Sequence, residues 1–185
     1  MRIIERAIIF ATEKHSGAVR KGNDIPYIVH PMEALSIAAT MTNDPEVLAA
    51  TVLHDVVEDT AVTIDQIEEG FGKRVADLVA WASEDKMSHI PPQESWKARK
   101  DATIKALGDA SLDEKIIMLA DKLSNMRGLY HGLIHKGDEI WRQFNQKDKR
   151  MHEWYYRAIL GALTPLSNSI AYQEFSYLID KVFNG

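Results

Sequence analysis

The sequence predicts an all-α protein, and three features lead to that fold class. Apolar residues recur with a helical period of about 3.6 residues almost throughout the chain. No segment shows the clean alternation of apolar and polar residues that marks a half-buried strand. The chain also lacks a glycine-rich strand–turn–helix unit, a repeat of about 20–50 residues and any low-complexity tract.

Helices are expected over residues 2–15, 32–41 and 45–60. The first has its apolar residues on one face, and Pro31 opens the second, where its missing N–H costs little. Asp44 is the expected N-cap of the third. That third segment, PEVLAATVLHDVVEDT, is apolar nearly all round, which is typical of a fully buried helix.

Thr63 and Gln66 have the spacing of a capping box and predict a helix that begins at Ile64. Gly72 separates this helix from another that is expected over residues 73–86, and a loop with two consecutive prolines follows at 87–95. The remaining helical segments are expected at 96–107, at 113–135 and through a long region from about 138 to 182.

Length and composition favour one domain over residues 1–185. The chain has no cysteine and a net charge of −5, from 22 basic and 27 acidic residues. Duplex-binding domains usually have a basic balance, so nucleic acid is not an expected partner. The sequence shows neither a signal peptide nor an apolar run of about 20 residues. We expect a soluble, cytoplasmic protein without a membrane partner, whose oligomeric state is left open.

Metal-competent side chains occur at three places within apolar sequence: His30 in PYIVHP, His54 and Asp55 in VLHDVVEDT, and Asp121 in IIMLADKLSN. Ionised aspartate is rarely buried unless it is paired or bound to a metal. Each of these residues alone is more often a hydrogen-bonded structural residue. Together, two imidazoles and two carboxylates predict a site for a divalent ion such as Mn²⁺, Fe²⁺ or Zn²⁺.

A second acidic pair, Glu58 and Asp59, follows one helical turn after His54 and Asp55. The i,i+4 spacing would stack the two pairs on one side of a helix, a crowding of charge that a metal ion offsets. The outer pair can then orient or deprotonate a water molecule. The alternative is that these acids only end the helix, although acids at a helix C-terminus oppose the macrodipole.

Basic residues gather in two clusters, which are either solvated surface or donors for phosphate groups: Arg20 and Lys21, and Lys97, Arg99 and Lys100. Two of the other histidines share an i,i+4 face but lack the glutamate of an HExxH zinc motif. We interpret all the remaining histidines as structural: His15, His89, His131, His135 and His152.

The series His30, His54-Asp55 and Asp121 resembles the metal signature of HD-superfamily phosphohydrolases. More narrowly, the chain resembles the (p)ppGpp hydrolase family, which comprises the hydrolase domain of Rel/SpoT enzymes and the stand-alone small alarmone hydrolases. Four segments carry this resemblance: RKGNDIPYIVHP, VLHDVVEDTAVT, FGKRVADLV and LADKLSNMR. It covers residues 5 to 160, approximately, and implies an HD-domain helical bundle with a C-terminal helical extension.

The resemblance implies a reaction and a set of roles. The family removes the 3′-pyrophosphate of guanosine 3′,5′-bis(diphosphate), giving GDP or GTP and pyrophosphate, with Mn²⁺. By this resemblance His30, His54, Asp55 and Asp121 would bind one ion, and Glu58 and Asp59 would position or activate the attacking water. Contacts to the nucleotide are implied for Arg20 and Lys21 at the base, Asn125 at the ribose, Arg99 and Lys100 near the phosphates, and Tyr155 in the pocket wall.

Two alternatives stay open. The same metal and acids could serve another small nucleotide, such as the 2′-phosphate of NADPH or a nucleoside monophosphate. A non-catalytic nucleotide sensor could keep the same fold, although a retired site has no physical need for this density of charge. About 25 residues follow position 160, far fewer than the about 100–150 of another domain, so we expect no synthetase module.

Overall fold

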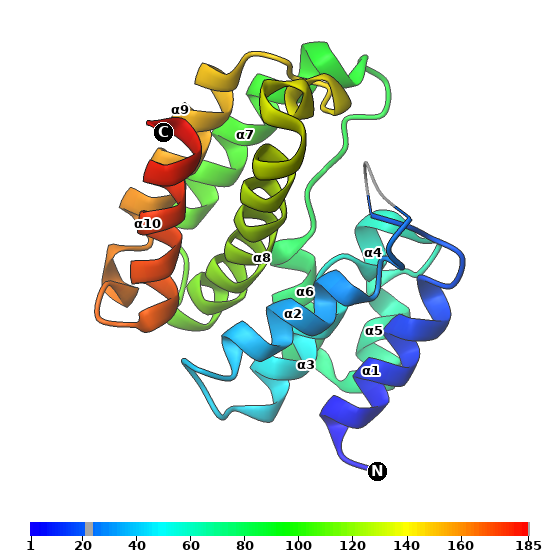
Figure 1. Ribbon diagram of the computed structural model, residues 1–185. Coiled ribbons are helices and arrows are strands. Elements are labelled where there is room, and N and C mark those ends of the chain that lie inside the picture. Colours follow the sequence, from blue (N-terminus) through cyan, green and yellow to red (C-terminus); the bar gives the residue numbers. More distant parts are fainter. Residues whose placement is uncertain (21–23, 185) are drawn as a thin grey trace.

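The computed structural model describes residues 1–20 and 24–184, and these residues are helical almost throughout (Figure 1). They form ten α-helices and two short 3₁₀ helices, and their one β-like feature is an isolated bridge between Val19 and Pro26. The predicted all-α fold class is therefore confirmed. None of the described helices is long and apolar enough to cross a membrane.

Six helices lie in the N-terminal half of the chain: α1 (Ile3–Lys14), α2 (Val29–Ala38), α3 (Pro45–Leu53), α4 (Val56–Asp59), α5 (Ile64–Phe71) and α6 (Lys73–Ala82). The C-terminal half contributes the rest: α7 (Pro92–Gly108), α8 (Leu112–Lys136), η1 (Gly137–Gln143), α9 (Lys149–Ala162), η2 (Thr164–Leu166) and α10 (Ile170–Phe183). The two predicted N-terminal caps are present, because Asp44 caps α3 and Thr63 forms a capping box with Gln66 at α5.

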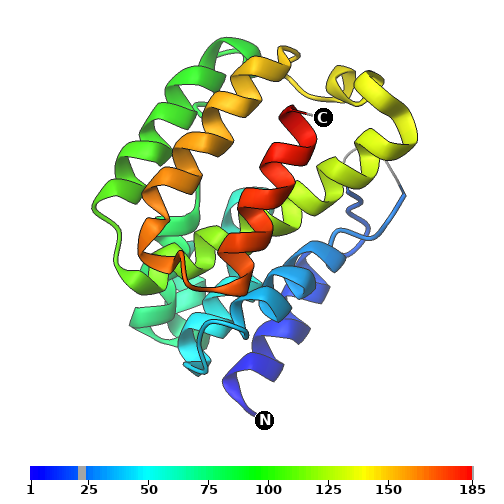
Figure 2. The same cartoon turned by 60° about the vertical axis from the view of Figure 1, so that its left-hand side comes forward.

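The long helix α8 runs between the two groups of helices (Figures 1 and 2). It packs against α2 on the N-terminal side and against α10 on the C-terminal side, while α3 packs against α1, α2 and α6. In the C-terminal group α7 and α10 both pack against α9. Residues of α8 therefore face both halves of the chain, and this helix links the candidate site to the C-terminal helices.

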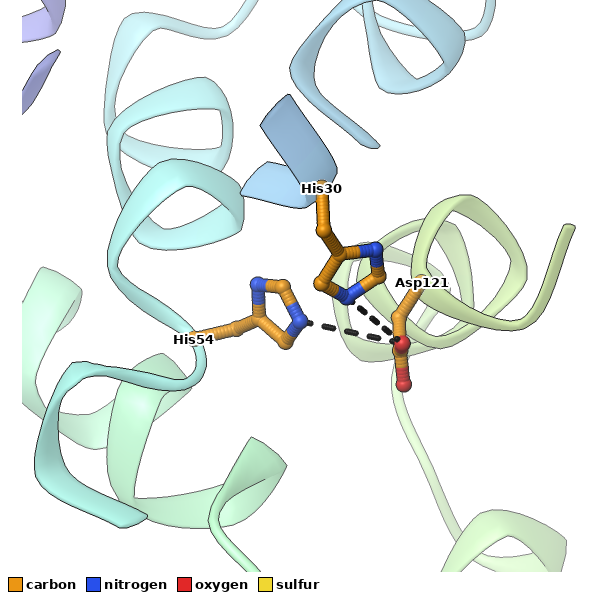
Figure 3. Close-up of side chains that lie close together, drawn as sticks. All are labelled: His30, His54 and Asp121. Carbon is orange, nitrogen blue, oxygen red and sulfur yellow. Dashed lines mark ion pairs between the residues drawn. The ribbon is translucent and has the colours of Figure 1, made fainter. Parts of the chain in front are cut away.

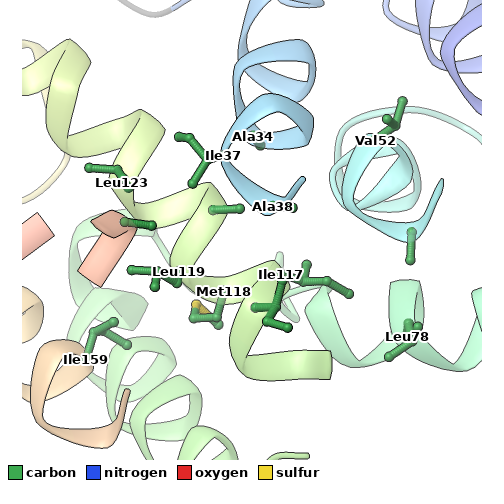
Figure 4. Packing of buried hydrophobic residues seen from close by; sticks show 14 of the residues in the cluster. Ala34, Ile37, Ala38, Val52, Leu78, Ile117, Met118, Leu119, Leu123 and Ile159 are labelled. Carbon is green, nitrogen blue, oxygen red and sulfur yellow. The ribbon is translucent and has the colours of Figure 1, made fainter. Parts of the chain in front are cut away.

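Buried aliphatic side chains hold α8 against its neighbours (Figure 4). Leu119 and Leu123 of α8 have no exposed surface, and neither has Ile159 of α9. On α2, which packs against α8, Ala34 and Ala38 are fully buried, and their small side chains permit close approach of neighbouring helices. Full burial of one leucine side chain stabilises a fold by about 1.5–3 kcal/mol, so this packing fixes the position of α8 firmly.

The prediction of one continuous helix over residues 45–60 is wrong at its centre. Helix α3 ends at Leu53, and His54 and Asp55 form a turn before α4 begins. His54 Nδ1 donates to the backbone oxygen of Thr51 at 2.7 Å, an acceptor that a continuing helix would offer to the N–H of Asp55. The turn brings His54 Nε2 to 3.1 Å from Asp55 Oδ2, although adjacent side chains on a straight helix diverge by about 100°.

Three other boundaries differ from those expected. Helix α2 begins at Val29, so His30 lies within its first turn and not before it. Helix α6 ends at Ala82 and not at residue 86: Ser83 has an extended backbone, and the N–H of Glu84 donates to Glu58 Oε2 and not to a carbonyl of the last turn. Helix α7 already begins at Pro92, a residue that is favoured in the first helical turn. The segment between α6 and α7 is therefore free to line the candidate site.

Candidate metal centre and active site

The four predicted metal ligands come together where α2, α8 and the turn after α3 meet. Figure 3 shows His30, His54 and Asp121 pointing toward one another, and their ligand atoms all lie within 4.8 Å of each other. His30 Nε2 is 3.3 Å from Asp121 Oδ1 and 3.4 Å from Asp55 Oδ2. His54 Nε2 is 3.7 Å from the same oxygen of Asp121. Three distant stretches of sequence thus supply one group of nitrogen and oxygen donors.

The hydrogen bonding of His54 leaves one ring nitrogen available to a cation. A backbone carbonyl can only accept, so the contact with Thr51 places the ring proton on Nδ1 and the lone pair of neutral His54 on Nε2. This Nε2 atom is buried and has no hydrogen-bond partner among the described residues. Two neutral nitrogens and two carboxylates are also a donor set that divalent transition metals accept. The residues present therefore fit a divalent metal ion.

The electrostatics of the group favour a cation. Burial by itself would raise the pKa of Asp55, but the imidazoles of His54 and His30 hold that pKa well below its usual range. Burial would also raise the pKa of Asp121, but Lys122 and the two imidazoles hold that pKa well below its usual range. For His54, burial lowers the pKa, yet the facing carboxylates raise it well above its ordinary value, so without a metal ion they favour a proton on Nε2 that a bound cation would replace. Both aspartates are therefore ionised and attract positive charge.

Neighbouring side chains orient the two carboxylates. The Tyr27 hydroxyl donates to Asp55 Oδ2 at 2.6 Å. Lys122 Nζ donates to Asp121 Oδ2 at 2.6 Å, and Asn125 Nδ2 donates to Asp121 Oδ1 at 2.5 Å. Asn125 lies four residues after Asp121, so the two share a face of α8. Such outer partners fix the direction in which ligand oxygens point.

Two of these partners, Tyr27 and Lys122, are absent from the sequence prediction. Lys122 directly follows Asp121, a neighbourhood that a plain surface pair would also explain. The structure places the side chains of Tyr27 and Lys122 at the wall of a cavity that Asp121 also lines. Asp121 itself is only 9% exposed. For Tyr27 the available signal was its place three residues before His30, at the end of a loop that must return to the first turn of α2.

A cavity of about 360 Å³ opens beside the donor group. Its lining combines ligand candidates, further acids and cations: His30, Asp55 and Asp121; Glu58, Asp59 and Glu84; Arg99, Lys100 and Lys122. Pockets of roughly 300–1,000 Å³ are typical of small-molecule sites. The cavity therefore has the candidate metal ligands on one side. Its other sides present acids that can exchange protons and cations that can bind anions.

Glu58 and Asp59 both line the cavity but differ in environment. Glu58 Oε2 accepts the backbone N–H of Glu84 at 3.1 Å. Burial, and next the charge of Asp55, raise the pKa of Glu58 above its ordinary value. The more exposed Asp59 forms an ion pair with Lys86, whose Nζ lies 2.6 Å from Oδ1. Glu58 therefore has the raised proton affinity that suits a general base.

The basic cluster at the start of α7 divides into two parts. Arg99 and Lys100 reach the cavity, where both pair with Glu84; the Lys100 Nζ lies 2.7 Å from Glu84 Oε2. Burial by itself would raise the pKa of Glu84, but these cations hold it below its usual range. Lys97 instead pairs with Asp101 on the exposed face of α7. Glu84 is a site residue that the sequence prediction missed, because it was expected inside a helix that in fact ends earlier.

A second cavity, of about 380 Å³, adjoins the first. The two share four lining residues: Tyr27, Lys100, Lys122 and Asn125. Arg20 lines the second cavity, and its Nη2 donates to Asn125 Oδ1 at 3.0 Å. Tyr155 is buried in the same wall, its ring centroid 5.0 Å from Lys100 Nζ and its hydroxyl unpartnered in the described part of the chain. Lys21, the other residue expected here, lies outside the described residues.

Among the described residues, none of the remaining histidines belongs to the group of clustered ligand atoms. His89, His131 and His135 are exposed. His152 is buried among aromatic rings of the C-terminal helices, and its Nε2 donates to the backbone oxygen of Gln146 at 2.8 Å. His15 is also buried, with its ring centroid 4.8 Å from that of Tyr27. His152 also lines the second cavity, and the structural roles expected for these five histidines stay predictions.

Comparison with known proteins places these features in a family. Residues 7–148 match the family model described as HD domain. The bifunctional (p)ppGpp synthase/hydrolase SpoT of Escherichia coli (strain K12) is 36% identical over 128 residues, which are 68% of this chain and 18% of SpoT. The chain thus spans under a fifth of the length of this relative.

Two solved structures are similar over most of the chain. The crystal structure of lmo0812 from Listeria monocytogenes EGD-e is 30% identical with a TM-score of 0.74, and the match covers 86% of this chain and 97% of that one. A metazoan ortholog of SpoT that hydrolyzes ppGpp is 26% identical with a TM-score of 0.76, covering 100% of this chain and 95% of that one. From the family match over residues 7–148, together with these relatives, we conclude that the chain belongs to the HD domain family.

Proposed function

We propose that this protein is a metal-dependent pyrophosphohydrolase that removes the 3′-pyrophosphate of ppGpp or pppGpp, giving GDP or GTP and pyrophosphate. One observation carries the proposal: His30, His54 and Asp121, with Asp55 beside both histidines, gather at a cavity that also presents Glu58 and several cations. The names of the SpoT relative and of the metazoan structure support the choice of substrate. The cytoplasmic location expected from the sequence is part of the proposal.

In this proposal His30, His54, Asp55 and Asp121 hold one divalent ion, and we propose Mn²⁺. The mixed nitrogen and oxygen donor set, with its buried unpartnered Nε2 of His54, supports a transition metal over a cation that takes oxygen ligands alone. When bound, such an ion supplies Lewis-acid activation of water and of a phosphoryl oxygen. Tyr27, Lys122 and Asn125 keep the carboxylate ligands in place by their hydrogen bonds.

Glu58 accepts the proton of the attacking water in this proposal. As the water oxygen bonds to phosphorus, the bond from phosphorus to the ribose 3′-oxygen breaks, and the 3′-oxygen takes up a proton from solvent. A carboxylate with a raised pKa is a better acceptor near neutral pH than an ordinary glutamate. The hydrogen bond from the backbone of Glu84 fixes Glu58 Oε2, and Oε1, with Lys86 Nζ at 3.9 Å, is the oxygen proposed to take the proton.

The cations around the cavity recognise the phosphate groups. Lys122 remains charged, since burial lowers its pKa but Asp121 raises it well above the ordinary value. Lys100 and Arg99 are held by Glu84 in the absence of substrate. A pyrophosphate group has more negative oxygens than one carboxylate, so it can displace Glu84 from these donors. Glu84 thus keeps the cations in position before the substrate arrives.

The second cavity is proposed to hold the nucleoside. Its shared wall with the first cavity supports one extended ligand across both, with phosphates beside Lys100 and the base beside Arg20. Asn125 lies between the metal group and Arg20, a position that suits a ribose contact. Tyr155 contributes an aromatic wall. A small anionic nucleotide, and not a nucleic acid, is therefore the proposed partner.

The test is a substrate panel with purified protein loaded with Mn²⁺. We expect ppGpp to yield GDP and pyrophosphate, with turnover lost on chelation and restored by Mn²⁺. Cleavage of NADPH or of a nucleoside monophosphate without cleavage of ppGpp would overturn the choice of substrate and retain the hydrolase. Binding of metal and of ppGpp without turnover of any nucleotide would overturn the enzyme assignment in favour of a sensor.

A further inference from the structure

A chain of hydrogen bonds leads from His30 to the C-terminal helix α10. His30 Nδ1 lies 2.8 Å from Ser124 Oγ of α8, and that hydroxyl donates to Glu33 Oε2 at 2.7 Å. Arg127 Nη1 donates to the other oxygen of Glu33 at 3.1 Å. Arg127 also donates through Nε and Nη2 to both oxygens of Glu174, at 2.6 and 2.7 Å.

Helical spacing accounts for this arrangement. His30 and Glu33 lie three residues apart on α2, and Ser124 and Arg127 lie three residues apart on α8, so each pair shares one face of its helix. The packing of α2 against α8 then brings the two faces together. His30 and Ser124 are buried, whereas Glu33 and Arg127 lie toward the surface. This series of hydrogen bonds therefore begins in the core, at His30, and ends between α8 and α10.

The direction of these bonds can be worked out from the number of protons. A serine hydroxyl has one proton, and a carboxylate has none to donate, so the proton between Ser124 and Glu33 belongs to the serine. Ser124 Oγ can then only accept from His30, whose Nδ1 must carry the ring proton. In a neutral imidazole this leaves the lone pair on Nε2, the atom that faces Asp55 and Asp121.

We propose that Glu33 and Ser124 are positioning residues that select the metal-binding tautomer of His30. Arg127, itself anchored by Glu174 of α10, holds Glu33 in the orientation that accepts the serine proton. Neither Glu33 nor Ser124 belongs to the donor group; both act through His30. The inference rests on the proposed function in one respect, that His30 is a metal ligand.

The two histidines of the donor group differ in how their tautomers are set. His54 donates to a backbone carbonyl, which no side-chain substitution removes. His30 depends on a serine and a glutamate, and its tautomer can therefore be changed by altering either one. This difference makes a direct test possible.

Glu33→Gln is the informative variant because it keeps the shape of the side chain and reverses one hydrogen bond. With its oxygen toward Arg127, the glutamine would present its amide N–H to Ser124 Oγ. The serine proton would then point to His30 Nδ1, and the ring proton would move to Nε2. In metal-free protein at one fixed pH, ring ¹⁵N spectra should show a proton on His30 Nδ1 in the wild type and none on that nitrogen in the variant. His30→Gln identifies the signals.

The same variant should bind Mn²⁺ about 10–100-fold more weakly by titration calorimetry, the usual effect of losing an outer partner of a metal ligand. Asp180→Asn is the matched control, since it removes an ion pair between α10 and Arg157 of α9 that has no link to His30. It should change neither the tautomer nor the affinity. If Glu33→Gln does not fold, Ser124→Ala replaces it and should show a mixture of both tautomers.

A His30 Nδ1 that carries no proton in the metal-free wild type would overturn the inference. An unchanged tautomer together with unchanged Mn²⁺ affinity in Glu33→Gln would do the same. A wild type that binds no Mn²⁺ would count against the proposed function, while the ring spectra of the metal-free protein would still decide the inference about Ser124 and Glu33.

Discussion

Replacing Glu58 by glutamine separates the chemical role of this residue from its structural one. The glutamine oxygen can still accept the backbone N–H of Glu84, a contact of 3.1 Å in the structure. The cavity wall and the four metal-ligand candidates should therefore keep their positions. What the variant loses is the carboxylate that accepts a proton from water.

The expected effect on turnover is large. General acid–base groups contribute about 10²–10⁴-fold to a rate, which is about 3–5 kcal/mol of transition-state stabilisation. The substitution should leave the free energy of unfolding unchanged or raise it. Because burial and Asp55 raise the pKa of Glu58, its ionised form opposes folding once the pH exceeds its ordinary value of 4.5. The neutral glutamine removes that opposition near neutral pH.

The assay combines three measurements on Glu58→Gln: kcat with ppGpp, metal content, and the melting temperature of the metal-free protein. We expect kcat to fall by about 10²–10⁴-fold, metal content to stay the same, and the melting temperature to stay or rise. Asp85→Asn is the control, because it removes a nearby negative charge while keeping the oxygen that accepts the Met87 N–H. An unchanged kcat in Glu58→Gln, or an equal loss in Asp85→Asn, would refute the reasoning.

The other predictions concern the metal, the core and pH. Asp121→Ala should lose both bound Mn²⁺ and turnover, as measured by metal analysis and activity, and full metal occupancy would remove Asp121 from the ligand set. Leu119→Ala should lower the free energy of unfolding by about 2–5 kcal/mol in urea titrations, since this side chain of α8 is fully buried. A loss well below about 1 kcal/mol would show that the surrounding core closes around the smaller residue. Burial lowers the pKa of His152 below its ordinary value of 6.5, so the unfolded chain takes up its proton first and stability should decline as the pH falls below that value. His152→Gln should make the decline shallower in urea unfolding at several pH values, and an identical decline would refute a role for this imidazole.

The parts of the fold that depend on local patterns were predictable from the sequence. The cap at Asp44 and the capping box at Thr63 each need only a few neighbouring residues, and both are present. The convergence of His30, His54 and Asp121 was also predictable, because carboxylate and imidazole groups within apolar sequence require partners. Their roles as ligands, and those of the residues around them, stay predictions.

The break between α3 and α4 was not predictable in this way. It depends on one side-chain hydrogen bond, from His54 to the backbone of Thr51, within a sequence whose helical period continues without interruption. The position of Glu84 likewise depends on the end of α6, where the Glu84 N–H donates to Glu58 and not to the helix. Individual hydrogen bonds of this kind can end a helix, and the apolar periodicity of the sequence does not reveal them.

The partners of the metal group depend on how the helices pack. Ser124 and Glu33 lie 91 residues apart in the chain and meet only because α2 lies against α8. Tyr27 and Asp55, 28 residues apart, likewise meet through the tertiary fold. No local pattern marks such pairs, and the same holds for Arg99, whose charge is taken up by Glu84.

Hydrolysis of ppGpp in ¹⁸O-labelled water tests the central claim most directly. The account predicts that Mn²⁺-loaded protein releases pyrophosphate with one ¹⁸O atom and GDP with none, because water attacks phosphorus and the 3′-oxygen stays with the nucleoside. Mass spectrometry of both products measures this outcome. Label in GDP, or intact ppGpp after incubation with metal-loaded protein, would contradict the account.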